Sequence, residues 1–274
     1  MRTIIMRSIH TPEELYQMER LQEAVWDKES VVPLHMTLTL QKCGAIYLGA
    51  FDGDEMIGFL YSFAGKDGDG TALFSHMLGF YPDYRRGGLG AQMKWLQREE
   101  AIKQGYHKIK WTYDPLETVN ANLNISKLGG IVRTYIPNCY GDLDDDMNRG
   151  LPTDRFMVEW LINSKRVENR RTQAERPSIA DNVPSILVYQ KKEANIPVPI
   201  SWNPDVDADT VAVPVPGVFQ EVKRHSMDIA RDWRKMTGEL FQHYFSKGYI
   251  VSEVIRHPQE PVVSYLLQKG VDLE

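Results

Sequence analysis

Residues 78–90 carry the clearest chemical signal in the sequence. A run of strand-forming residues ends in Leu78-Gly79-Phe80, and Arg85-Arg86-Gly87-Gly88-Leu89-Gly90 follows, where an apolar pattern with helical spacing begins. Glycines let the backbone approach a ligand closely, and the unpaired N–H groups at a helix N-terminus attract anions. The turn therefore predicts a phosphate-binding site. The alternative is a glycine turn that only packs a helix on a sheet.

Two common phosphate-binding motifs fit this turn poorly. A P-loop needs a lysine followed by serine or threonine after its last glycine, and no such pair follows Gly90. A dinucleotide-binding motif needs a third glycine where this sequence has Met93, and it needs a βαβ unit where we predict consecutive antiparallel strands.

The elements that position the turn are predicted from capping residues, periodicity and turn residues. Thr11-Pro12-Glu13-Glu14 combines a capping hydroxyl, a proline at the first helical position and a glutamate three residues after the cap, so we predict a helix from Pro12 to Trp26. The further predictions up to residue 162 are a strand at 3–9, a short helix at 37–42, strands at 45–51, 56–63 and 72–80, a helix from 89 to a stop at 105, a strand at 107–112, a helix at 116–130, and strands at 131–136 and 156–162.

With these elements around it, the pattern Arg85-x-x-Gly88-x-Gly90 resembles motif A of the GNAT superfamily of acyl-CoA-dependent N-acyltransferases. The resemblance covers the element order from about residue 3 to 160. The stretches WTYDP, NANLNISKLGG, residues 135–141 and NRGLPTDRFMVEW resemble a bacterial branch of longer predicted acetyltransferases with a C-terminal extension. Some members of that branch are associated with N-acylamino-acid racemases and act as amino-acid N-succinyltransferases.

The resemblance implies that acetyl-CoA or another acyl-CoA is the co-substrate and that no metal is needed. The pyrophosphate would lie on the backbone N–H groups of residues 86–90, and the pantetheine arm would run along the end of the preceding strand. The cofactor-binding residues implied in this way are Leu78, Gly79, Phe80, Arg85, Arg86, Gly87, Gly88, Leu89, Gly90 and Asn120.

Acyl transfer to an amine also needs a proton acceptor for the amine and a proton donor for the leaving thiolate. In many family members a tyrosine on the helix after the fifth strand is the donor, but this sequence has Ile125 at that position. His76, which we expect on the same strand face as Leu78, is our candidate base, and Tyr113 is our candidate acid. A packed histidine and a core tyrosine are the alternatives.

Three further residues are candidates for binding the acceptor. Asn124 is four residues after Asn120, so we expect both on one helical face, either lining a cleft or packing against a loop. Arg133 and Arg155 could bind a substrate carboxylate, or each could form a structural ion pair. The acidic residues between 142 and 146 lack the glycine and distal glutamate of a calcium loop, and we expect a solvated loop there.

Composition excludes several classes of protein. Apolar residues make up 42% of the 274 residues, which is ordinary for a globular protein, and the formal net charge of −5 argues against non-specific binding to nucleic acid or anionic lipid. No apolar run approaches the roughly 20 residues of a membrane span. The two cysteines are too few for a disulfide framework. We expect a cytoplasmic protein with no nucleic-acid or membrane partner.

We expect an α/β fold in which a GNAT-like mixed, mostly antiparallel sheet is flanked by helices. Residues 1–163 would be the acyl-CoA-binding catalytic domain, residues 164–182 a linker or surface loop, and residues 183–274 a smaller C-terminal α/β region. That last region, with a proline-rich stretch at 197–216, a long helix ending at Gly248 and a terminal hairpin, would be accessory or degenerate, or else a surface for a homodimer.

The expected activity is transfer of an acetyl group from acetyl-CoA to the amine of a small molecule, for example an amino acid. One alternative is an amino-acid N-succinyltransferase that uses succinyl-CoA. A second alternative, suggested by the missing tyrosine, is a CoA-binding module without catalysis.

Overall fold

The computed structural model describes residues 3–26, 28, 31–85, 87–141, 143, 145, 147–172 and 183–273. The chain divides into two compact units. Unit 1 comprises Met1–Trp111 with Leu161–Asn163, and unit 2 comprises Thr112–Trp160 with Ser164–Glu274. The boundary between these units differs from the one that we predicted at residue 163. The division into a catalytic domain and an accessory region stays a prediction about function.

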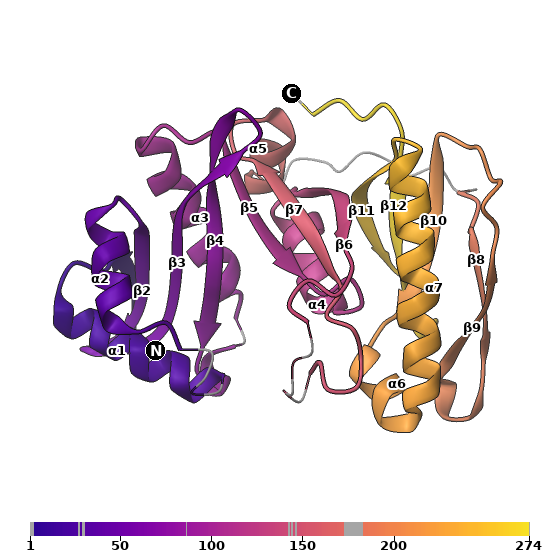
Figure 1. Cartoon of the computed structure of the whole chain (residues 1–274), viewed down its shortest axis with the longest axis horizontal. Coiled ribbons are helices and arrows are strands. Elements are labelled where there is room, and N and C mark those ends of the chain that lie inside the picture. The colour runs from indigo at the N-terminus through magenta and orange to yellow at the C-terminus, as the bar shows by residue number, and fades with distance from the viewer. Residues whose placement is uncertain are drawn as a thin grey trace. The chain divides into compact units, whose positions relative to one another are not determined.

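Unit 1 contains a mixed sheet (Figure 1). Its strands β1 (Ile4–Ser8), β2 (Ile46–Asp52), β3 (Glu55–Asp67) and β4 (Gly70–Phe80) are successive antiparallel neighbours, and β4 pairs in parallel with the start of β5 (Lys108–Tyr113). Three helices flank this sheet: α1 (Pro12–Val25), α2 (Leu34–Lys42) and α3 (Leu89–Lys103). A short 3₁₀ helix, Pro82–Tyr84, lies between β4 and α3.

Helix α1 begins where the sequence predicts it. The Thr11 side chain accepts a hydrogen bond from the Glu14 N–H at 3.2 Å, and the Glu14 carboxylate accepts one from the Thr11 N–H at 3.2 Å. This capping box fixes the first turn, so Leu15, Met18 and Leu21 face the sheet. The core on this side consists of Ile9, Leu15, Met18, Leu21, Tyr47, Phe51, Met56, Phe59 and Tyr61.

Unit 2 has a second set of strands, in the order β7 (Arg155–Leu161), β6 (Ile131–Ile136), β11 (Ile250–Arg256), β12 (Val262–Gln268), β10 (Thr210–Pro216). All the pairings described among these strands are antiparallel. Strands β8 (Leu187–Lys191) and β9 (Pro197–Trp202) form a separate ribbon. The sheets and flanking helices of both units confirm the predicted α/β class.

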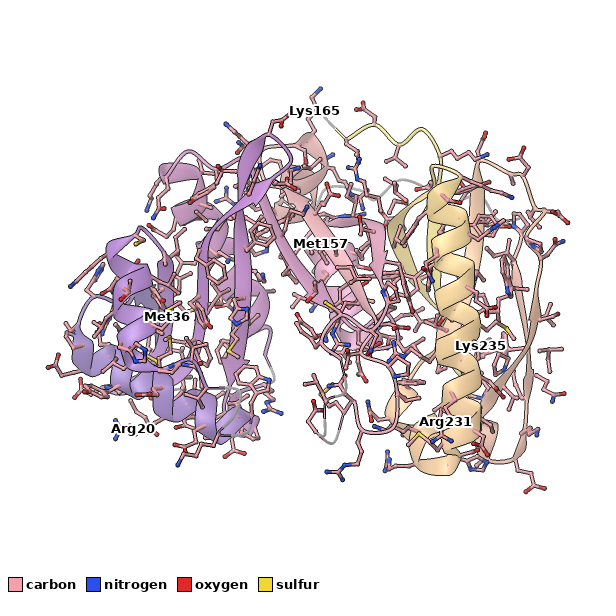
Figure 2. All side chains as sticks on the ribbon, in the orientation of Figure 1. Arg20, Met36, Met157, Lys165, Arg231 and Lys235 are labelled. Atoms are coloured by element: carbon pink, nitrogen blue, oxygen red, sulfur yellow. The ribbon has the colours of Figure 1, made fainter. Side chains whose placement is uncertain are left out.

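The long helix α7 (Met227–Ser246) follows α6 (Phe219–His225) and forms much of the core of unit 2. Its buried face includes Trp233, whose indole N–H donates to the Pro197 carbonyl of β9 at 2.9 Å. Arg231 and Lys235 lie on its exposed face (Figure 2). The predicted long helix and terminal hairpin are therefore both present.

Two predictions about unit 2 need correction. Residues 164–182 were expected to be a linker, but Lys165–Arg171 form helix α5, which Ser164 caps by accepting a hydrogen bond from the Val167 N–H. Residues 173–182 of that stretch lie outside the described residues. The predicted helix at 116–130 is shorter and irregular: α4 spans Thr118–Ala121, and a π-helical turn spans Asn122–Lys127. Of the helices described, none is long and apolar enough to cross a membrane.

Candidate active site

The glycine-rich turn has the backbone geometry of an anion cradle. Gly87 has φ +85° and Gly88 has φ +80°, values that favour glycine, and Gly88 is the N-cap of α3 without a side-chain cap. A Cβ at either position would meet no heavy atom within 4 Å, so there is room for a larger side chain. It is the positive φ that favours glycine at both positions. The first N–H groups of α3, at Leu89 and Gly90, have no acceptor within the helix. Arg86 falls outside the described residues.

The end of β4 presents a free backbone edge. The Tyr81 N–H donates to the Ile57 carbonyl at 3.1 Å, and with the register Phe59↔Gly79 this makes alternate residues of β4 bond to β3. Leu78 and Phe80 therefore direct their N–H and C=O groups to the other edge. On that edge β5 pairs only with Leu73 and Phe74 in the part of the chain that the structure describes.

The Arg85 side chain contacts the last residue of this edge. Its Nε donates to the Phe80 carbonyl at 3.1 Å, which confirms that this carbonyl points away from β3. The Arg85 side chain is exposed, so its charge stays available beside the glycine turn. The described members of the predicted set from Leu78 to Gly90 thus lie at the end of β4, in the connection that follows it and at the start of α3, where Leu78 Cδ2 is 3.8 Å from the position of a Cβ on Gly90.

His76 occupies a β-bulge in β4. Tyr61 pairs with Met77 and Ser62 pairs with Ser75, so His76 is the extra residue between them. Its ring contacts Tyr61 edge-on, with centroids 5.3 Å apart, on the sheet face that α1 covers.

Leu78 points to the opposite face, because its Cδ2 lies 3.8 Å from where a Cβ on Gly90 of α3 would be. The prediction that His76 and Leu78 share a face is wrong, because the bulge shifts the alternation of side chains. The His76 side chain is exposed, and desolvation where its ring packs on Tyr61 and Phe63 lowers its pKa from the usual value of 6.5.

Tyr113 lies in unit 2 and is buried. Its hydroxyl donates to the Tyr265 hydroxyl at 3.3 Å, and Tyr265 in turn donates to the Pro115 carbonyl at 2.6 Å. Burial raises the pKa of the Tyr113 phenol. These contacts match the core role that the sequence left open for Tyr113, and its role as an acid stays a prediction.

The two asparagines of the following helix differ in burial. Asn120, in α4, is exposed, whereas Asn124 is buried in the π-helical turn together with Ile125. The Asn124 carbonyl accepts a hydrogen bond from the Gly130 N–H at 2.9 Å, which holds the end of the turn. π-Helical turns are frequent at functional sites, but the binding roles of both residues stay predictions.

Both candidate arginines form ion pairs within unit 2. Arg133 contacts the Glu159 carboxylate through Nε at 3.1 Å, while 44% of its side chain stays exposed. Arg155 donates to Asn148 Oδ1 at 3.0 Å and lies 3.8 Å from the Asp114 carboxylate. Arg155 is thus held by protein partners, whereas Arg133 retains exposed surface that an anionic group can approach.

Arg234 and Lys94 are buried charged residues that the sequence analysis did not single out. Arg234 of α7 forms a bidentate pair with Asp114, with nitrogen–oxygen distances of 2.8 and 2.5 Å. Lys94 of α3 is only 3% exposed. The helical spacing of Gly90, Lys94, Gln97 and Ala101 is the signal that could have placed Lys94 on the buried face.

The described residues of the acidic loop form no metal centre. Asp145 Oδ1 accepts hydrogen bonds from the N–H groups of Met147 and Asn148, both at 2.8 Å, so it stabilises a local turn. Asp142, Asp144 and Asp146 lie outside the described residues. Among the residues that are described, no group of three or more His, Cys, Asp or Glu side chains is arranged to hold a metal ion.

Comparison with known proteins gives a family match for the first part of the chain. Residues 9–124 match the model of the acetyltransferase (GNAT) family. No curated protein matches the sequence.

Three solved structures are similar to a little more than half of the chain. An acetyltransferase of the GNAT family from Streptococcus pneumoniae is 15% identical, with 57% of this chain and 98% of that chain covered and a TM-score of 0.47. An aminoglycoside 6'-acetyltransferase type Ii is 18% identical, with coverages of 58% and 97% and a TM-score of 0.47. The NatC complex bound to Gag peptide and CoA is 14% identical, with coverages of 58% and 98% and a TM-score of 0.47.

Proposed function

We propose that this chain, whose residues 9–124 match the model of the acetyltransferase (GNAT) family, is an acyl-CoA-dependent N-acyltransferase that acetylates the amine of a small molecule, with amino acids as the first acceptors to test. The observation that carries the proposal is that the free edge of β4 and the uncapped start of α3 lie close together within unit 1. Leu78 and Phe80 offer backbone groups along the strand, and Leu89 and Gly90 offer N–H groups at the helix end.

These backbone groups suit the two polar parts of an acyl-CoA. The pyrophosphate matches the N–H groups and the positive end of the α3 dipole, and Arg85 adds a cation beside them. The pantetheine amides match the N–H and C=O groups of Leu78 and Phe80, as an added strand would. A backbone N–H of the same edge can also stabilise the oxyanion that forms at the thioester carbonyl.

His76 is our proposed base. At neutral pH a substrate amine with a pKa near 10 is mostly protonated, so a nearby base must accept its proton before or during attack. His76 is exposed, lies in the bulge two residues before the free edge at Leu78, and has a pKa below 6.5, so it is neutral and able to accept a proton at pH 7. Its neighbours Tyr61 and Phe63 pack against the ring and restrict its motion, and neither of them is a charged partner.

The acceptor is the least constrained part of the proposal. An amino acid presents a carboxylate beside its amine, and Arg133, with its exposed guanidinium, is the candidate that retains surface for such a group. We also propose that residues 183–274 are accessory to the reaction. They contribute β10, β11, β12 and α7 to unit 2, so their removal should leave that unit insoluble.

The test is free-thiol release from acetyl-CoA and, separately, from succinyl-CoA, with panels of L- and D-amino acids and simple amines. Thermal shifts with CoA, NAD and ATP serve as binding controls, since a ligand at about 100 times its dissociation constant adds about 2.7 kcal/mol. Amine-dependent thiol release supports the proposal, and the better donor chooses between acetyl and succinyl transfer. A shift with CoA but no turnover on any amine would instead indicate a binding module. A shift with NAD or ATP alone would overturn the proposal.

A further inference from the structure

Lys94, in helix α3 of unit 1, is a buried lysine whose hydrogen bonds in the described part of the chain go to uncharged groups. It is 3% exposed, and its Nζ donates to Ser75 Oγ at 2.9 Å and to Gln97 Oε1 at 3.2 Å. Nζ also lies 3.6 Å from the centre of the Trp111 ring. Burial of an amine without a carboxylate beside it is costly, so the presence of Lys94 in the core needs an explanation.

The three contacts of Lys94 match the three N–H bonds of a protonated amine. A hydroxyl oxygen, an amide oxygen and the face of an indole ring can each receive one of these bonds. The Gln97 amide turns its oxygen toward Lys94, although its Nε2 then has no hydrogen-bond partner among the described residues. The three contacts together hold Nζ at one point in the core.

This point lies where the described pairing between β4 and β5 ends. The last described pair is Phe74 with Lys110, so Ser75 and Trp111 are the first residues beyond it on the two strands. Lys94 bonds to the side chain of one of them and contacts the ring of the other. The lysine therefore connects α3 to both strands at the place where the free edge of β4 begins.

Helix α3 contacts β4 on both sides of the β-bulge. His76 is the extra residue of the bulge, and a bulge bends its strand and increases the local twist. Before the bulge, Lys94 bonds to Ser75. After the bulge, Leu78 Cδ2 is 3.8 Å from the position of a Cβ on Gly90. Gly90 and Lys94 are four residues apart and share a helical face, so this face of α3 holds both parts of the bent strand.

The two elements joined in this way carry the backbone groups that we propose for acyl-CoA. The start of α3 offers N–H groups to the pyrophosphate, and Leu78 and Phe80 offer backbone groups to the pantetheine arm. Both parts belong to one ligand, so they bind together only if the helix start and the strand edge keep a fixed spacing. The hydrogen bond between Lys94 and Ser75 ties α3 to β4 beside this edge.

We propose that Lys94 is a positioning residue for acyl-CoA, which holds the free edge of β4 at a fixed distance from the phosphate-binding start of α3. In this role the buried amine contacts no substrate and takes part in no chemical step. It acts through Ser75 on the strand that carries Leu78 and Phe80. The proposal rests on the proposed function, because it needs acyl-CoA to bind along β4.

The experiment compares the binding of CoA with that of 3′-phospho-ADP, which is CoA without its pantetheine arm, by titration calorimetry on the full chain. Lys94→Met keeps an unbranched apolar side chain and removes the amine. We expect it to bind CoA at least about tenfold more weakly, the scale of a lost hydrogen bond or two, and to bind 3′-phospho-ADP within about twofold of the wild type. Lys103→Met is the matched control, because it makes the same change at an exposed position of α3, and it should bind both ligands like the wild type.

Ser75→Ala is a second and milder variant, because it removes the acceptor on β4 and leaves the lysine in place. We expect the same selective loss of CoA affinity, smaller than in Lys94→Met. Thermal unfolding without ligand shows which variants fold, and Ser75→Ala decides the question if Lys94→Met does not fold.

Unchanged CoA affinity in the folded variants would overturn the proposal, and so would an equal loss for both ligands, which would mean that Lys94 only stabilises α3. A wild-type chain that binds CoA no more tightly than 3′-phospho-ADP would also overturn it, while amine-dependent thiol release would still support the proposed function. Failure of the proposed function is distinct, because the wild type would then show neither CoA binding nor thiol release, and the positioning role would fall with it.

Discussion

Trp26 lies directly against the backbone of Gly79. A Cβ on Gly79 would be 2.6 Å from Cη2 of the indole and 3.2 Å from Cε1 of Phe59, so this point of β4 has no room for a side chain. The indole and the Phe59 ring meet edge-on, with centroids 5.9 Å apart. Gly79 thus lets Trp26, the residue that follows α1, cover the strand whose other edge we propose to hold acyl-CoA.

Gly79→Ala should destabilise unit 1 by about 1–3 kcal/mol, because the added methyl group overpacks the contact with Trp26. Urea unfolding measures the change. Gly70→Ala, in the same strand but with only a backbone oxygen at 3.8 Å, is the control and should differ from the wild type by less than about 0.5 kcal/mol. If the steric explanation holds, Trp26→Ala should recover part of the loss in the Gly79→Ala background. Equal stability of Gly79→Ala and Gly70→Ala would contradict it.

Gly88→Ala should weaken binding of CoA at least tenfold. The change forces alanine into φ +80°, which costs about 1–2 kcal/mol, and it places a methyl group where the backbone must approach a phosphate. Gly105→Ala is the matched control, because Gly105 has φ +82°, the same open surroundings and a place at the other end of α3. Titration calorimetry with CoA compares the two variants. Equal losses of affinity would show that strain alone is responsible.

His76→Gln should lower kcat/KM by about 100-fold and remove a titration from its pH profile. Because the pKa of His76 is depressed, the neutral base form prevails above pH 6.5, and wild-type activity should rise with pH through a midpoint below that value. The stability contribution has the same sign: it is fully present above pH 6.5 and is lost as the pH falls through the folded-state pKa. An unchanged rate and profile in His76→Gln would remove this residue from the mechanism.

Arg234→Met and Asp114→Asn should each destabilise unit 2 by about 3–5 kcal/mol, since each leaves a buried charge without its partner. The double variant should cost less than the sum of the two, because no uncompensated charge remains from the pair. Urea unfolding of the four proteins completes the cycle. Additive effects would mean that the bidentate pair contributes little beyond the packing of each side chain. Arg231→Met, which removes an exposed arginine one turn earlier in α7, is the control.

Local signals in the sequence determined most of the elements and the backbone geometry of the glycine-rich turn. The capping box of Thr11 and Glu14 and the glycines at 87 and 88 each depend on residues close together in the chain. Capping and left-handed φ are short-range effects, so they can be read without knowledge of the fold. The roles of Leu78 and Phe80 in binding acyl-CoA came from the resemblance and stay predictions.

Only the tertiary structure decided which side chains act together. The bulge at His76 depends on the register with β3, and it reverses the face that strand alternation predicts. Lys94 meets Ser75 and Trp111 only when α3 packs on the sheet, and Asp114 meets Arg234 across 120 residues of sequence. Burial and long-range pairing depend on packing between segments that are far apart in the sequence. No local sequence pattern therefore predicts them. The geometry of the glycine-rich turn was therefore predictable from the sequence, whereas the contacts of His76, Lys94 and Asp114 were not.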